Sequence, residues 1–161
     1  AARASPEAAA GSASAKERAV RILSAATVSR AELEHRLRQK GESPENARQA
    51  VEWLAGLSLL DDEAAARQIV RSGAAKGYGA ARIRQELTRR GIDRDTAEAA
   101  MQTFSPDEAQ MLALLEKRLR GDVSDRKEVE KAVAALQRRG FAWNDIKRAL
   151  ETYGSSLPEE E

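Results

Sequence analysis

The chain has few residues of the types that carry out acid–base, metal or nucleophilic chemistry. It contains no cysteine and a single histidine, His35, so the ligands of most zinc sites and the partners of a Cys–His pair are missing. Asp61 and Asp62 are adjacent carboxylates, a pattern that suggests acid–base or metal chemistry. Neighbouring side chains on a helix diverge, however, and acidic residues at a helix start satisfy free N–H groups. We therefore interpret this pair as helix capping.

A glycine-rich segment is the other candidate for chemistry. Gly73, Gly77 and Gly79 precede an expected helix, but the Gly-Lys-Ser/Thr sequence and the preceding strand of a phosphate-binding loop are missing from the sequence. We expect His35 to be a solvated or half-packed helix residue. The sequence therefore predicts no catalytic residue, no metal site and no cofactor, and a protein that is not an enzyme.

Basic residues gather in one stretch of the chain. Between Arg67 and Ile92, seven cations stand against one anion, Glu86, which gives a local net charge of +6. The seven cations are Arg67, Arg71, Lys76, Arg82, Arg84, Arg89 and Arg90. Tyr78 lies among them between two glycines, and an exposed aromatic ring among cations can stack on a base or fill a pocket of a protein partner. The alternative is a solvated helix face with Tyr78 packed on its own module; we favour the contact surface.

A second group of cations follows towards the C-terminus, where many acids offset it. Its members are Lys131, Arg138, Arg139, Lys147 and Arg148. Trp143 lies outside the apolar stripe of its expected helix, so we expect it to be partly exposed, whereas we expect Trp53 to be buried in a core. Arg138, Arg139 and Trp143 join the basic stretch as candidate contact residues.

The elements that position these residues are expected to be helices. Ala, Leu, Glu and Arg dominate the chain and aromatic residues make up only 4% of it, so an all-α fold is predicted. The net charge of +1 argues against binding nucleic acid through bulk charge alone but leaves room for a local basic face. No apolar run approaches the roughly 20 residues that span a bilayer. Together with the absence of cysteine, this predicts a cytoplasmic protein with no membrane partner.

Three segments of the chain superimpose without gaps and reveal an internal repeat. Each contains a leucine, two intervening residues, a basic residue and a glycine. The leucine and glycine pairs are Leu37 and Gly41, Leu87 and Gly91, and Leu136 and Gly140. The glycines lie about fifty positions apart, a spacing typical of a helical repeat array. A glycine after a basic last turn predicts the end of a helix.

A new helix is expected to begin after each glycine. Ser43 and Asp93 are predicted N-caps, and Pro44 suits the first helical position. Apolar residues then return at i, i+4 and i+7, the stripe with which a helix buries one face. These stripes are Ala47, Val51 and Leu54; Ala97, Met101 and Phe104; and Ile146, Leu150 and Tyr153.

A further helix precedes each pair, which predicts nine helices in three sets. A set of roughly 45 residues buries little surface alone, so neighbouring sets must stack. We expect three three-helix repeats stacked into an elongated curved rod, flanked by a disordered N-terminal segment and a disordered acidic tail. The expected segments are 1–15 (disordered), 16–60, 61–104 and 105–153 (repeats 1 to 3) and 154–161 (tail).

Three passages of the sequence carry a family resemblance. They are Leu57-Ser58-Leu59-Leu60-Asp61-Asp62 with Ala66, Gly77-Tyr78-Gly79 through Arg82-Ile83 and Glu86-Leu87 to Arg90-Gly91-Ile92, and Leu136 through Arg139-Gly140-Phe141 to Ile146. In this order and at these separations they resemble the RecX family, from about Lys16 to Tyr153. Two positions depart from the family pattern: Ala65 replaces a common aromatic residue, which affects the core of the second module, and Ala80 replaces a common proline, which affects only how a helix begins.

The resemblance implies a non-enzymatic regulator of the RecA recombinase. Such proteins bind in the helical groove of the RecA filament on single-stranded DNA, limit its growth, and so damp strand exchange, ATP hydrolysis and SOS signalling. The partners implied are the RecA filament and the single-stranded DNA within it, and we expect a monomer. Two alternatives remain: a helix-turn-helix DNA-binding module, which the acidic starts of the third helices disfavour, and a helical scaffold for some other protein. Whether the regulator only inhibits, and how many RecA subunits it spans, stays open.

Overall fold

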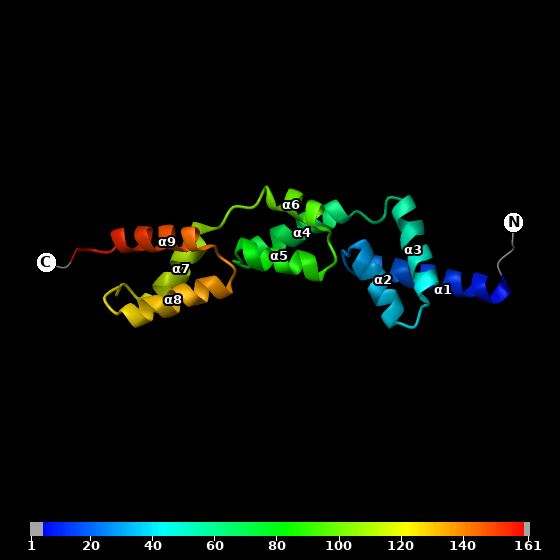
Figure 1. Cartoon of the computed structure of the whole chain (residues 1–161), viewed down its shortest axis with the longest axis horizontal. Coiled ribbons are helices and arrows are strands. Elements are labelled where there is room, and N and C mark those ends of the chain that lie inside the picture. The colour runs from blue at the N-terminus through cyan, green and yellow to red at the C-terminus, as the bar shows by residue number, and fades with distance from the viewer. Residues whose placement is uncertain (1–4, 160–161) are drawn as a thin grey trace. The chain divides into compact units, whose positions relative to one another are not determined.

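The computed structural model describes residues 5–159, and within this range the chain forms nine helices and no strand (Figure 1). The helices are α1 (Pro6–Ala25), α2 (Arg30–Gln39), α3 (Pro44–Gly56), α4 (Asp62–Ala75), α5 (Ala80–Arg89), α6 (Arg94–Met101), α7 (Glu108–Leu119), α8 (Arg126–Arg138) and α9 (Trp143–Ser155). They follow one another in three sets of three, so the predicted all-α, three-repeat fold is confirmed.

Each set turns after its second helix at a glycine. The φ angle is 94° at Gly41, 75° at Gly91 and 92° at Gly140, a left-handed conformation that glycine adopts without the steric cost of a Cβ atom. The predicted glycine turns are confirmed at all three positions.

The predicted caps at the helix starts are also present. Ser43 Oγ accepts a hydrogen bond from the N–H of Asn46 at 3.1 Å, and Pro44 is the first residue of α3. The Asp93 carboxylate accepts one from the N–H of Thr96 at 2.9 Å. This bond, followed by a second from the Thr96 hydroxyl, lowers the pKa of the Asp93 carboxyl.

The two adjacent carboxylates cap two different helices. Asp61 accepts a hydrogen bond from the N–H of Ala64 at 3.1 Å, in the first turn of α4. Asp62 instead accepts one from the N–H of Arg30 at 2.9 Å, at the start of α2. The capping interpretation of this pair is therefore confirmed, and Asp62 additionally joins the second set of helices to the first.

The described chain divides into two compact units, and the division passes through the middle set of helices. One unit contains the residues up to Arg67 together with Leu87–Glu98, and the other contains Gln68–Glu86 together with the residues from Ala99 onward. Each of α4, α5 and α6 thus contributes residues to both units. We call them the N-terminal unit and the C-terminal unit.

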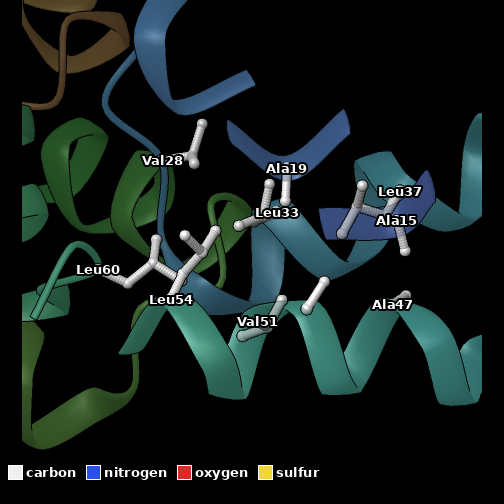
Figure 2. Close-up of a cluster of buried hydrophobic side chains, with 10 residues drawn as sticks. Ala15, Ala19, Val28, Leu33, Leu37, Ala47, Val51, Leu54 and Leu60 are labelled. Carbon is white, nitrogen blue, oxygen red and sulfur yellow. The ribbon is translucent and has the colours of Figure 1, made fainter. Parts of the chain in front are cut away.

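The core of the N-terminal unit lies between α1, α2 and α3 (Figure 2). Leu33, Leu37 and Leu54 are fully buried there, and Ala15 and Ala19 of α1 pack against them. Alanine side chains add little volume, so α1 can approach its two neighbours closely. Farther along α1, Gly11 lies so near α3 that an added Cβ atom would stand 2.8 Å from the Asn46 amide nitrogen.

Both ends of the described chain are more ordered than the sequence led us to expect. Helix α1 begins at Pro6 and includes residues 6–15 of the segment that was expected to be disordered, so that expectation is wrong for these ten residues. Alanine is the strongest helix former, and small residues suffice for the packing of α1. Helix α9 reaches Ser155 and Leu157 packs on the adjoining core, so the expected tail 154–161 is ordered over its first residues. Residues 1–4, 160 and 161 lie outside the described range.

The core of the C-terminal unit lies between α7, α8 and α9. Leu115, Leu136 and Ile146 are fully buried at its centre. Tyr153, the last residue of the α9 stripe, is 4% exposed; its hydroxyl donates a hydrogen bond to Glu116 Oε2 at 2.6 Å and accepts one from the N–H of Gly121 at 2.8 Å. Burial, and then the bond to Glu116, raise the pKa of the Tyr153 hydroxyl.

Trp53 corrects one sequence-based expectation. Its side chain was assigned to the core, but it is 39% exposed, and the Lys16 ammonium lies 5.2 Å from the centre of its ring. The buried stripe of α3 is formed by smaller residues, Ala47, Val51 and Leu54. Trp53 lies just off this stripe, and its large apolar area alone was not sufficient reason to place it inside.

Candidate interaction surface

The loop between α4 and α5 docks on the turn that follows α8. The N–H of Gly79 donates a hydrogen bond to the Arg139 carbonyl at 2.8 Å, and the N–H of Ala81 donates one to the Gly140 carbonyl at 3.1 Å. A Cβ atom added at Gly79 would lie 2.3 Å from backbone atoms of Gly140 and Phe141. Only glycine allows this approach, which fixes the second and third sets together within the C-terminal unit.

Tyr78 and Arg82 form a cation–π pair at this joint. The Arg82 guanidinium carbon lies 4.0 Å from the centre of the Tyr78 ring, and its Nη2 atom donates a long hydrogen bond of 3.4 Å to the Tyr78 hydroxyl. The tyrosine is half-buried, while Arg82 is exposed. The two predicted contact residues are therefore adjacent, and their guanidinium is available to an anionic or aromatic group of a partner.

Two more predicted cations lie at the same joint. Arg139 is exposed, and its Nη1 atom comes within 3.4 Å of the place where a Cβ atom of Gly77 would stand. Lys76 is exposed in the residue before Gly77. The structure thus brings together Lys76, Tyr78, Arg82 and Arg139, which were predicted from two separate parts of the sequence. We call these four residues the joint cluster.

The other candidates of the C-terminal unit are exposed but distributed over several elements. Arg71 lies on α4, Arg84 on α5 and Arg138 at the end of α8, all with exposed side chains. Trp143 begins α9 and is 53% exposed, which confirms that it lies outside the core. An exposed tryptophan is a suitable anchor for a protein partner.

Arg90, another predicted contact residue, is paired within the chain. Its guanidinium bonds Glu32 Oε2 at 3.2 Å and the Thr27 carbonyl at 2.9 Å, and its own carbonyl accepts a hydrogen bond from the buried Ser29 hydroxyl. Glu32 also pairs with Arg36 at 2.6 Å. Arg90 therefore fastens the residue after α5 to α2 within the N-terminal unit, so less of its guanidinium is available to a partner. Sequence position alone could not show this pairing, because the two residues are far apart in the chain.

The remaining two cations of the basic stretch, Arg67 and Arg89, are exposed in the N-terminal unit. The stretch is therefore shared between the two units, although it looks continuous in the sequence. The residues that gather most closely are those of the joint cluster.

Sequence reasoning missed two cations of α7. Lys117 and Arg118 are exposed and line a groove of about 470 Å³ together with Arg139. The groove follows a stripe on α7 in which Gln110, Leu114, Lys117 and Arg118 recur at helical spacing. That periodicity was visible in the sequence, but it was read only for apolar residues that form a core.

Neither a cluster of metal ligands nor a membrane-spanning helix is found among the described residues. Across residues 5–159, no three His, Asp or Glu side chains are grouped so that they could hold a metal ion. In the same range, no helix combines the length and the apolar character needed to cross a bilayer.

Comparison with known families identifies the family of this chain. Three family models match the chain in consecutive order: the RecX first three-helix domain over residues 15–54, the second over 61–101 and the third over 106–150. The chain belongs to the RecX family. The family's three-helix domains correspond to the three sets of helices, so the resemblance found in the sequence is confirmed.

Curated RecX proteins are similar over most of their length. "Regulatory protein RecX" of Xanthomonas campestris is 40% identical over 135 residues, which cover 83% of each chain. The protein of the same name from Halorhodospira halophila is 34% identical over 145 residues, or 89% of this chain and 90% of the relative. That of Chromohalobacter salexigens is 32% identical over 136 residues. These relatives establish the regulatory family at the level of sequence.

Solved RecX structures establish the fold independently. The crystal structure of RecX from Lactobacillus salivarius superimposes with a TM-score of 0.80 and covers 90% of this chain and 97% of its own, at 23% identity. A second crystal structure of regulatory protein RecX gives a TM-score of 0.78 at 22% identity. The RecX fold is thus retained at low sequence identity.

Proposed function

We propose that this RecX-family chain is a non-enzymatic regulator that binds the RecA filament on single-stranded DNA and restrains its growth. Through that binding it lowers ATP hydrolysis and strand exchange by RecA and so modulates recombination and the SOS response. The observation that carries the proposal is the consecutive match of all three RecX domains over residues 15–150. The protein acts as a monomer, in the cytoplasm where RecA filaments form, and needs no cofactor.

The joint cluster is the proposed centre of the contact surface. It presents three cations and one half-buried aromatic ring, a combination suited to phosphate groups, to unstacked bases and to acidic side chains. Further exposed candidates in the C-terminal unit are Arg71, Arg84, Arg138 and Trp143. Arg67 and Arg89 are candidates in the N-terminal unit. The net charge of only +1 suits a partner that is mainly protein, with DNA as a minor component of the contact.

ATP hydrolysis by RecA tests the proposal. The purified protein is titrated into RecA, single-stranded DNA and ATP at two salt concentrations. We expect inhibition well below one molecule per RecA subunit, because blocking a growing filament end needs few molecules. We also expect weaker inhibition at high salt if the exposed cations contribute. Full hydrolysis at equimolar concentration of well-folded protein would refute the proposed function.

A duplex-reading helix-turn-helix module is the competing function. The third helices of the three sets carry Glu45, Asp95 and Asp145 in their first turns. These carboxylates would repel the phosphates that flank a major groove. Tight, base-selective binding of duplex DNA in the absence of RecA would favour that function instead.

A further inference from the structure

A groove in the C-terminal unit runs beside α7 towards the turn after α8. Its accessible apolar surface comes from Ala113 and Leu114 of α7. Leu136 of α8 and Phe141 of the turn also line the groove but are almost completely buried. Gly77 and Gln110 close one end, where an added Cβ atom on Gly77 would stand only 2.1 Å from the Gln110 side-chain oxygen. The α7 residues from 110 to 118 span about 12 Å of helix axis, which is enough for about two turns of a helical peptide.

The charge on this groove has one sign. Lys117, Arg118 and Arg139 line it, and no acidic residue does. Among the described residues, none of these three side chains takes part in an ion pair. Three exposed cations around an apolar surface give a groove that complements a ligand with negative charge and an apolar group.

The N-terminal unit has a groove at the corresponding place, and the contrast between the two is informative. That groove, of about 580 Å³, lies between α1 and the end of α2 and is also lined by cations, among them Arg18 and Arg36. There, however, Arg18 pairs with Glu42 at 3.2 Å and Arg36 with Glu32 at 2.6 Å. Two cations of this groove are thus paired with acids of the chain, although Lys40, which also lines it, is in none of the ion pairs of the described residues. In the groove of the C-terminal unit, none of the three cations is paired within the described residues.

The apolar residues distinguish between the anions that could occupy the groove of the C-terminal unit. A phosphate backbone is satisfied by cations alone and gains little from Leu114 or Phe141. A peptide with acidic side chains and one apolar anchor satisfies both the cations and the apolar surface. We propose that this groove binds a short acidic segment of a protein partner, with an aliphatic or aromatic anchor against Ala113 and Leu114. The proposal deepens the proposed function and rests on it for the partner, which would be RecA.

Binding of a defined peptide tests the groove without RecA. The probe is a fluorescent peptide of roughly ten residues in which glutamates alternate with leucines at helical spacing. We expect wild-type protein to bind this peptide. It should bind much more weakly to a peptide in which glutamine replaces glutamate or serine replaces leucine. Reversal of both α7 charges, Lys117→Glu with Arg118→Glu, should weaken binding at least about tenfold. Ala113→Glu, at an exposed position on the apolar surface, should do the same by filling the groove.

A matched variant controls for net charge. Lys127→Glu with Lys147→Glu makes the same change of charge at two exposed positions outside the groove and should leave peptide binding unchanged. Equal binding of the glutamate and glutamine peptides, or no loss of binding in the Lys117→Glu, Arg118→Glu variant, would overturn the proposal. The proposal would also be overturned if a single-stranded oligonucleotide bound more tightly than the peptide and the Lys117→Glu, Arg118→Glu variant abolished that binding. The groove would then be a nucleic-acid site.

The ATP-hydrolysis assay separates failure of the groove from failure of the proposed function. If wild-type protein binds the peptide but does not inhibit RecA, the groove binds acidic peptides as proposed, but the proposed regulation of RecA is refuted. If wild-type protein inhibits RecA but binds no peptide, and the groove variant inhibits as strongly, the function stands and the groove proposal fails.

Discussion

At the scale of single residues, Gly79 and Gly140 determine how closely two turns can approach. A Cβ atom at Gly79 would lie 2.3 Å from backbone atoms of Gly140 and Phe141, and one at Gly140 would lie 2.4 Å from the backbone nitrogen of Arg82 in α5. Gly140 also has a φ of 92°. Backbone atoms cannot move aside as the end of a side chain can. The joint cluster therefore depends on residues that contribute no side chain to it.

Replacing Gly79 with alanine should destabilise the C-terminal unit. We expect a loss of at least about 2 kcal/mol in the free energy of unfolding, because the clash breaks the two hydrogen bonds of the joint. Urea denaturation measures the change. The matched control is Gly154→Ala, at a helical position with nothing within 4 Å of the added atom, which should be neutral or stabilising by up to about 1 kcal/mol. Equal effects of the two substitutions would contradict the close approach.

Tyr153 should give the folded state a pH dependence in the alkaline range. Its pKa is raised in the folded protein, so the neutral hydroxyl binds its proton more tightly there than in the unfolded chain, where the value is near 10. The stabilisation is therefore fully present below pH of about 10 and is lost as the pH rises through the folded pKa. Thermal unfolding of wild type and Tyr153→Phe, compared across this range, isolates the effect. An identical pH dependence in both proteins would show that the hydroxyl is not responsible.

At the scale of elements, the carbonyl group at the same position of each glycine turn has a different hydrogen-bond donor. The carbonyl of the residue before each glycine accepts a hydrogen bond: that of Lys40 from Arg18, that of Arg90 from Ser29 and that of Arg139 from Gly79. In the second and third sets the donor comes from the preceding set, whereas in the first set it comes from α1 of the same set. The repeats are therefore joined through the carbonyl ends of their second helices.

Ser29 should be more important than an ordinary helix cap. It is 1% exposed, accepts a hydrogen bond from the N–H of Glu32 and donates one to the Arg90 carbonyl. Ser29→Ala removes the cap and leaves a carbonyl without its donor, so we expect a loss of about 2–3 kcal/mol in the free energy of unfolding. Ser43→Ala, which removes only a cap, should cost about 1 kcal/mol. Chemical denaturation distinguishes the two values, and a smaller loss for Ser29→Ala than for Ser43→Ala would contradict the joint.

Substitution of exposed cations on α5 tests the proposed contact surface. Reversal of two charges, Arg82→Glu with Arg84→Glu, should weaken inhibition of RecA by roughly tenfold, equivalent to about 1.4 kcal/mol of binding, because both side chains are exposed. The helical circular dichroism spectrum should be preserved. Arg90→Gln is the instructive comparison: it should lower stability, since it breaks the contacts to Glu32 and Thr27. Unchanged inhibition by the double variant would exclude α5 from the contact but not the family function.

At the scale of the whole molecule, local patterns predicted the elements well. The spacing of Leu37–Gly41 and its two counterparts gave the glycine turns, and the positions of Ser43 and Asp93 gave the helix starts, because these features depend on neighbours within a few residues. The all-α, three-set organisation followed from them.

The errors concern contacts between residues distant in the chain. Pairing of Arg90 with Glu32 depends on how two sets of helices meet, and burial of Ala15 depends on the surface that α2 and α3 offer. Trp53 was expected in the core, but the buried stripe of α3 is filled by smaller side chains. The charged stripe of α7 was overlooked because the helical period was applied only to apolar residues.

Direct binding to preformed filaments tests the central claim. Fluorescently labelled protein is mixed with RecA filaments assembled on single-stranded DNA, with the same DNA alone and with RecA alone, at near-physiological salt. A RecA-filament regulator with a net charge of only +1 should bind the filament far more tightly than bare DNA, because most of the contact is with protein. Equal affinity for filament and bare DNA, or no binding to filaments by protein with an intact helical spectrum, would contradict it.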